Sequence, residues 1–221
     1  MINKNYTIKK IDNSKIYINF VKNNHYSKTC PNGIINFGCF DKTNKLVGVG
    51  VFGQVIGRFQ SNKYYPENPS KLIELRRLVF INDTLKNIES WFIGYCLRYI
   101  SKNTDYEAIL SLADSNQSHT GIIYKATGFK QIGYDMDKRK RIIINGIERH
   151  PRDLYDKHGT SSVPVLKEIY KENISFIDKK PKIIFLKILH KSYKVNTRQV
   201  HCRNGGSNPT LVHQVKLNKF M

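Results

Sequence analysis

The segment formed by residues 108–129 constrains the fold most, because it reads as a strand, a polar turn and a short helix in succession. The apolar run at 108–113 has the length of a buried strand and stops at Asp114. Five polar residues follow, and a second apolar pattern at 122–126 closes at Gly128, where a glycine commonly ends a helix. In an open α/β sheet, the crevice beyond the carboxyl end of such a strand is where chemistry usually takes place.

Two side chains in this segment are the first candidates for function. Asp114 lies at the predicted strand end, and Tyr124 lies on the short helix, near enough to face the same crevice. Each also has a purely structural explanation, because an aspartate at a strand end often caps the next helix and a helical tyrosine is often part of the packing. The residues alone leave both explanations open.

The rest of the chain alternates between strand-like and helix-like patterns. Strands are predicted at residues 2–10, 34–40, 45–52, 72–80, 174–177 and 183–189, and helices at residues 14–23, 88–101 and 163–170. Residues 129–134 and 141–148 are predicted to form a further strand pair. Asn87 is the predicted N-cap of the helix at 88–101. This alternation predicts an α/β fold.

Two of the predicted strands contain residues that are unusual in a strand. The strand at 45–52 is rich in glycine, which lets a ligand or another backbone approach closely, or marks a bulge. The strand at 72–80 contains Glu74, Arg76 and Arg77, and charges inside an apolar strand need partners or a ligand. The arginines could instead pair structurally with nearby carboxylates.

Charge is the strongest global signal. The chain has 37 Lys and Arg against 17 Asp and Glu, a formal net charge of +20, which favours a polyanionic partner such as nucleic acid. A basic composition also arises in proteins from AT-rich genomes, and the abundance of Lys, Asn, Ile and Tyr fits that explanation. The connection at 54–70 mixes basic and aromatic residues, as nucleic-acid contact requires. The residues expected to contact DNA are Arg58, Lys63, Tyr64, Tyr65, Lys138, Arg139 and Arg152.

The composition also bears on the compartment. The chain has no run of about 18 apolar residues, so no membrane span is expected, and its N-terminus lacks the apolar region of a signal peptide. The four cysteines show no zinc-binding spacing. We therefore expect a cytoplasmic protein.

The order of elements and the sequence Ile-Tyr-Lys-Ala-Thr-Gly-Phe at 123–129 resemble the GNAT N-acetyltransferases over residues 1–148. The resemblance implies a mixed central sheet flanked by helices, an acetyl-CoA or related acyl or alkyl donor, and a role for Tyr124 in protonating the departing thiolate. It also places donor contacts at Asn87 and Ser115. The family's glycine-containing pyrophosphate loop is missing, because residues 81–87 read Ile-Asn-Asp-Thr-Leu-Lys-Asn.

Four blocks in order resemble a narrower group, the phage Mom family of DNA-modifying enzymes. They are His25-Tyr26, the Glu-Leu-Arg-Arg-Leu at 74–78, the segment 113–129, and the segment 149–162. The resemblance implies modification of adenine N6 in double-stranded DNA to the carbamoylmethyl form, which protects DNA from restriction enzymes. It places function on His25, Tyr26, Arg76, Arg77, Asp114 and Tyr124, and it implies iron held by His25, Tyr26 and Asp114.

The predicted domain organisation has three parts: a GNAT-like catalytic domain at 1–148, a small C-terminal extension packed on it at 149–190, and a basic, flexible tail at 191–221. Besides DNA modification, two readings stay open at this stage. One is an acyl-CoA-dependent N-acetyltransferase acting on a small amine or a protein. The other is a nucleic-acid-binding protein without enzymatic activity on a degenerate scaffold.

Overall fold

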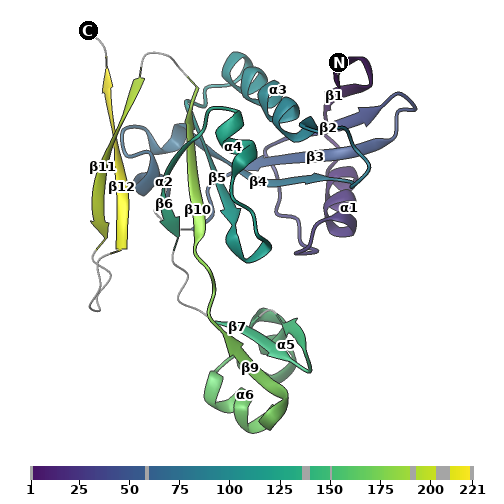
Figure 1. Cartoon of the computed structure of the whole chain (residues 1–221), viewed down its shortest axis with the longest axis vertical. Helices are drawn as coiled ribbons and strands as arrows, with labels where there is room; N and C mark the ends of the chain where they lie inside the picture. Colours follow the sequence, from purple (N-terminus) through teal and green to yellow (C-terminus); the bar gives the residue numbers. More distant parts are fainter. Residues whose placement is uncertain are drawn as a thin grey trace.

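A seven-stranded sheet forms the centre of the computed structural model, which describes residues 2–57, 60–135, 140–149, 151–189, 193–202 and 210–219. The strand order is β1-β2-β3-β4-β5-β10-β6 (Figure 1). β4 and β5 run parallel, and every other neighbouring pair of this sheet is antiparallel. The strands are β1 (Tyr6–Lys10), β2 (Ile35–Asp41), β3 (Leu46–Gly53), β4 (Leu72–Phe80), β5 (Ala108–Asp114), β6 (Lys130–Asp135) and β10 (Lys182–Ile188).

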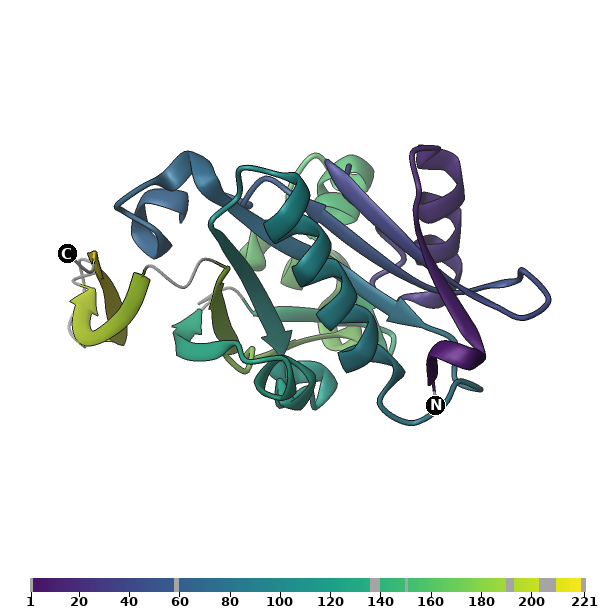
Figure 2. The same cartoon turned by 90° about the horizontal axis from the view of Figure 1, so that it is seen from above.

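Helices cover both faces of this sheet. α3 (Ile88–Asn103) and α4 (Ile122–Ala126) pack on one face, while α1 (Ser14–Asn24) and α2 (Gln60–Tyr64) pack on the other. Figure 2 shows α1 and α3 on opposite sides of the strands. Because α3 buries a full stripe of apolar side chains against the sheet, it is the main element that closes the core on its side.

The glycines of β3 make room for large side chains within the fold. A Cβ at Gly48 would overlap the ring of Phe80, and one at Gly50 would lie 2.7 Å from the ring of Phe92. The bulge that the glycine-rich pattern also suggested is present where β3 pairs with β4. The close approach at these two positions is therefore made by aromatic rings of the core.

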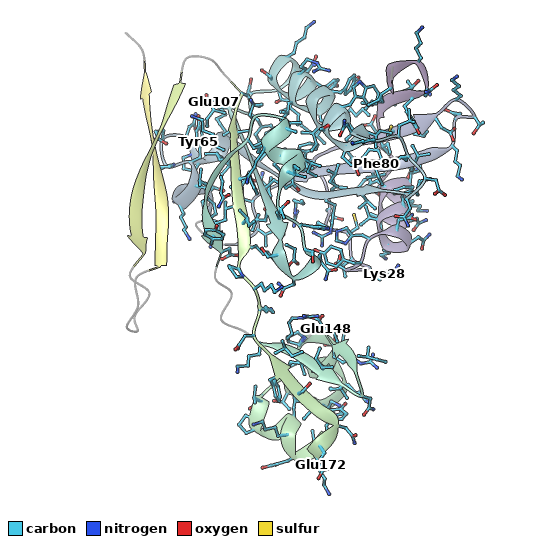
Figure 3. All side chains as sticks on the ribbon, in the orientation of Figure 1. Lys28, Tyr65, Phe80, Glu107, Glu148 and Glu172 are labelled. Atoms are coloured by element: carbon cyan, nitrogen blue, oxygen red, sulfur yellow. The ribbon has the colours of Figure 1, made fainter. Side chains whose placement is uncertain are left out.

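A small lobe interrupts the main sheet between β6 and β10. It contains β7 (Arg141–Ile144), β8 (Ile147–Arg149), α5 (Pro151–His158), α6 (Val163–Tyr170) and β9 (Ile174–Ile177). The lobe has its own apolar core, made of Ile142, Ile144, Leu154 and Leu166. Figure 1 shows it below the main sheet, and Figure 3 places Glu148 and Glu172 in it.

The lobe corrects the predicted pairing of residues 129–134 with 141–148. β6 pairs with β10 instead, and β7 pairs with both β8 and β9. A tight Asn-Gly turn with positive φ at both residues favours the local β7–β8 hairpin, so these residues fold with the lobe. The units therefore differ from the predicted ranges: residues 141–149 belong with the lobe, and β10 belongs to the main sheet.

The C-terminal segment, predicted as a flexible tail, forms a two-stranded antiparallel sheet of β11 (Tyr193–Cys202) and β12 (Thr210–Lys219). Short 3-10 turns lie at η1 (Ile2–Lys4), η2 (Pro69–Lys71), η3 (Ser115–Gln117) and η4 (Lys171–Asn173). Within the described residues, no helix is both long and apolar enough to cross a membrane.

Most of the predicted elements of the main sheet are confirmed, including β4, β5, α3 and the strand–turn–helix segment that ends at Gly128 with a φ of 78°. Asn87 is the N-cap residue of α3 as predicted, but it does not cap the helix through its side chain. Asn87 has a left-handed backbone, with a φ of 66°, and its side chain makes no capping hydrogen bond. A left-handed residue turns the chain sharply into α3, so the backbone conformation sets the start of the helix.

Candidate active site

The site begins where β4 and β5 separate. The two strands pair in parallel from Leu72 and Ala108 to Leu75 and Ser111, and their pairing stops there. Beyond that point the strands line a cleft of about 1000 Å³, which extends to the N-terminal ends of α3 and α4. The pairing of β4 with β5 ends at Leu75 and Ser111, but both strands continue. The cleft therefore presents backbone groups and side chains of both strands to a ligand.

His25 and Tyr26 reach this cleft from the loop that follows α1. The His25 Nδ1 accepts a hydrogen bond from the Ser27 backbone N–H at 3.1 Å and lies 2.7 Å from the Ser27 hydroxyl. Burial, followed by the positive charge of Arg77, lowers the pKa of His25 to about 4. His25 is therefore a neutral imidazole at neutral pH.

Tyr26 connects this loop to the end of β5. Its hydroxyl donates to the Asp114 Oδ2 at 3.2 Å across 88 positions of sequence. Burial and the neighbouring Asp114 carboxylate raise the pKa of Tyr26 to about 12, so the phenol keeps its proton. The ring is nevertheless 49% exposed, which leaves it accessible from the cleft.

Asp114 is held by the turn that follows it. The Asn116 backbone N–H and side-chain amide donate to its Oδ1 at 2.9 and 3.0 Å. Burial acts to raise the pKa of Asp114, but these bonds and the charge of Lys182 leave it below its ordinary value. Asn116 also exchanges two hydrogen bonds with the backbone of Lys180, which joins the small lobe to β10.

Arg76 and Arg77 line the cleft from β4 and fix the loop that carries His25. Arg76 Nη1 donates to the Asn32 carbonyl at 3.0 Å, and Arg77 donates to the carbonyl and hydroxyl of Thr29 at 3.1 and 3.3 Å. Arg76 Nε is buried and has no partner among the described residues. Neither arginine forms an ion pair with Asp114 within the described part of the chain, so their structural partners are backbone groups.

Tyr124 lies deeper, at the base of the cleft. It is 8% exposed and packs against the rings of Phe129 and Phe185. Its hydroxyl has the Ser111 side chain as a hydrogen-bonding neighbour, and burial raises its pKa. Tyr124 therefore combines the two explanations that the sequence left open, because it belongs to the core and also lines the cleft.

The structure brings the six predicted catalytic residues to one cleft, which is lined by His25, Tyr26, Arg76, Arg77, Asp114 and Tyr124. The predicted donor contact Asn87 also lines it, whereas Ser115 is not among its lining residues. Among the lining residues that were not predicted as functional, two are ionisable side chains close to the predicted ones, Glu74 and His119. Glu74 is buried with a pKa raised by burial, and His119 lies beside Tyr26 with ring centroids 6.2 Å apart. Both belong to motifs that the sequence singled out, but only the tertiary structure shows that their side chains line the cleft.

The iron hypothesis receives no support from the arrangement of its three ligands. Among the described residues, no group of three or more His, Cys, Asp or Glu side chains is placed to hold a metal ion. Tyr26 remains a protonated phenol whose hydroxyl is used by Asp114, and His25 Nδ1 is used by Ser27. The arrangement therefore gives no support to an iron site, and we assign no chemical step to iron.

The predicted DNA contacts divide into three groups. Tyr64 and Tyr65 are buried, so neither ring lies open on the outer surface as expected, although Tyr64 also lines the cleft. The Tyr65 hydroxyl donates to Glu107 at 2.9 Å, and Figure 3 shows these two residues together. The two tyrosines are buried because α2 packs them against β4, β5 and β10. Lys63 stays exposed, with its ammonium 5.1 Å from the Tyr64 ring. Arg58, Lys138 and Arg139, and the side chain of Arg152, lie outside the described residues.

The split sheet and its helices define the class of fold, which is that of the GNAT N-acetyltransferases. Spermidine/spermine N-acetyltransferase SpeG from Vibrio cholerae matches with a TM-score of 0.51 and 9% sequence identity, over 86% of this chain and 95% of that one. A dodecameric spermidine N-acetyltransferase from the same organism matches with a TM-score of 0.50 and 10% identity, over 85% and 95%. At these identities the likeness shows the fold alone.

The chain belongs to the Mom protein family, whose model matches residues 5–204. The methylcarbamoylase mom of Escherichia phage Mu is 28% identical over 140 residues, which are 58% of this chain and 58% of that protein. The match thus spans less than two thirds of the relative's length. The family match includes every residue that lines the cleft.

Proposed function

We propose that this chain is a phage-type transferase that modifies the N6 amino group of adenine in DNA, by carbamoylmethylation, and so protects the DNA from restriction. The observation that carries the proposal is that a member of the Mom family gathers His25, Tyr26 and Asp114 in one cleft through direct contacts. The name of the phage Mu relative, methylcarbamoylase, supports the type of group transferred.

The chemistry must overcome a weak nucleophile. The N6 lone pair of adenine is delocalised into the ring, so the amino group needs a partner that accepts its proton as the new bond forms. Asp114 is an ionised carboxylate at the cleft, and Glu74 is a second carboxylate with a pKa raised by burial. In this proposal Asp114 orients the amino group and accepts its proton, directly or through the Tyr26 hydroxyl, as the bond from N6 to the transferred carbon forms and the donor's bond to its leaving group breaks.

Tyr124 is suited to protonate the leaving group. Burial raises its pKa, so the phenol holds its proton at neutral pH and can give it to a group that leaves with negative charge. Tyr124 lines the same cleft as the start of α3, so in this proposal its proton lies on the side of a donor molecule bound at that helix end. Arg76 also lines the cleft, and in this proposal its guanidinium binds a carbonyl oxygen of the same molecule.

The cleft also has a place for an acyl or alkyl donor. It extends to residues 84–87 and the first turn of α3, whose leading N–H groups are free of partners within the helix. A phosphate group of a CoA-type donor is favoured at such a helix end. The left-handed Asn87 gives this loop a backbone conformation that glycine often supplies, although the glycines of other GNAT loops are absent here.

The partner in this proposal is double-stranded DNA. The net charge of +20 supports phosphate contacts, and the target adenine would leave the base stack to reach Asp114. The second candidate function is acyl-CoA-dependent N-acetylation of a small amine or protein. The resemblance of the fold to N-acetyltransferases and the helix end at the cleft favour it, but it leaves the excess of basic residues without a role.

Mass spectrometry of nucleosides from the DNA of cells that express the protein tests the proposal. We expect a modified deoxyadenosine with the wild type and none with Asp114→Asn. The matched control is Asp105→Asn, because Asp105 precedes β5 at its other end and its carboxylate is 92% exposed in an ion pair with Lys71. If the DNA of cells expressing the wild type is unmodified and the purified protein acetylates polyamines, the proposed function is rejected and the second candidate function takes its place.

A further inference from the structure

The mouth of the cleft contains three aromatic rings in contact. The rings of His25 and Tyr26 lie 4.1 Å apart between centroids in a tilted arrangement, at an interplanar angle of 31°. The ring of His119 lies 6.2 Å from that of Tyr26 at 69°, in an edge-on arrangement. His119 is distant in sequence from the adjacent residues His25 and Tyr26, so the cluster exists only in the folded chain.

The cluster is rigid and yet open. Tyr26 is anchored through its hydroxyl to Asp114, and His25 is anchored through its Nδ1 to Ser27. One face of the Tyr26 ring is covered by His25, but the residue is 49% exposed, whereas the core tyrosines Tyr17 and Tyr65 are 2% and 0% exposed. An aromatic ring that is held in place and keeps an accessible surface is available to stack on a flat ligand.

The chemistry of the surroundings selects the ligand. The rings of His25 and Tyr26 lie beside the Asp114 carboxylate, to which the Tyr26 hydroxyl donates at 3.2 Å. A ring platform beside a carboxylate suits a flat heterocycle with an exocyclic amino group, whose face stacks on the rings and whose N–H groups reach Asp114. Adenine has this combination.

We propose that Tyr26, backed by His25, is the stacking platform that receives the target base once it has left the DNA duplex, with His119 at its edge. The inference rests on the proposed function and gives Tyr26 a task different from metal binding or proton transfer. In this arrangement the ring of Tyr26 holds the base, and its hydroxyl keeps Asp114 aligned with the amino group. Stacking between aromatic side chains is a general way of holding an extrahelical base.

The test separates the ring from its hydroxyl. A DNA duplex with 2-aminopurine opposite an abasic site offers a base that leaves the stack readily, and its fluorescence reports the surroundings of that base. We expect binding of the wild type to change the fluorescence, Tyr26→Phe to keep most of the change, and Tyr26→Leu to lose it. Affinity for a short single strand, measured by anisotropy, should fall roughly 5- to 150-fold in Tyr26→Leu, the range for one lost stacked base.

The matched control is Tyr155→Leu, which removes a tyrosine that is 57% exposed on the small lobe, away from the cleft lining, and should keep the fluorescence response. A response equally lost in Tyr26→Phe and Tyr26→Leu would overturn the proposal, because the hydroxyl would then be the required group. A wild type that gives no response would also overturn it. If nucleoside mass spectrometry still finds modified adenine in that case, the proposed function survives while the stacking platform does not.

Discussion

Replacing Gly121 by alanine should destabilise the protein more than the same change at Gly128, although both glycines flank α4 with left-handed backbones. Their φ angles are 73° and 78°, so an added Cβ costs about 1–2 kcal/mol of backbone strain at either position. At Gly121 the new Cβ would also overlap the ring of Phe185, which is fully buried. At Gly128 it would meet only the flexible end of Lys187, 2.8 Å away.

The overlap with Phe185 accounts for the expected difference in stability between Gly121→Ala and Gly128→Ala. Overpacking a core typically costs about 1–3 kcal/mol, which corresponds to a melting temperature roughly 2–12 °C lower for Gly121→Ala than for Gly128→Ala in a chain of this size. Phe185 packs against Tyr124, with ring centroids 5.3 Å apart, so the same change should also displace a cleft residue. Differential scanning calorimetry of both variants measures the difference directly.

A compensating substitution makes the reasoning sharper. Phe185→Leu removes the ring that the new Cβ would strike, so the double variant Gly121→Ala/Phe185→Leu should lose less stability than the sum of the single variants. Equal melting temperatures for Gly121→Ala and Gly128→Ala, or strictly additive losses in the double variant, would refute the assignment of Gly121 to a steric contact with Phe185.

Three further predictions concern the cleft and the tail. The pKa of His25 lies near 4 in the folded protein, below the unfolded value of about 6.5. The unfolded state therefore binds the proton first, and the free energy of unfolding should fall as the pH drops from about 6.5 towards 4. An NMR titration of His25 with a midpoint near 6.5 would contradict this. Asn116→Ala removes hydrogen bonds to Asp114 and Lys180 and should lower the free energy of unfolding, measured by urea titration, by about 1–3 kcal/mol. An unchanged urea midpoint would show that these bonds do not stabilise the fold. Ending the chain at Leu189 leaves the main sheet and removes six basic residues, which are Lys191, Lys194, Arg198, Arg203, Lys216 and Lys219. The near-ultraviolet circular dichroism should persist, while the slope of log K for DNA binding against log[salt] should become shallower. An unchanged slope would exclude the tail from phosphate contact.

Local patterns in the sequence were sufficient for most elements of the main sheet. β4 has the boundaries that its apolar run predicts, and α4 ends before Gly128 because only a residue that tolerates positive φ continues the chain there. The strand pairing of residues 129–148 was not predictable in this way. Periodicity reports how a segment buries its side chains, but it carries no information about which distant strand becomes its neighbour.

The candidate site shows the same division. The sequence by itself determined which residues are candidates for chemistry, since the motifs around His25, Glu74 and Asp114 stand out by residue type and by resemblance. The tertiary structure alone decided what each one faces. It placed Tyr26 against Asp114 and exposed its ring, while it buried Tyr65, which the sequence had offered equally as a DNA contact. The physical reason is that burial and hydrogen-bond partners are properties of the packed sheet, because they depend on contacts between segments that lie far apart in the chain.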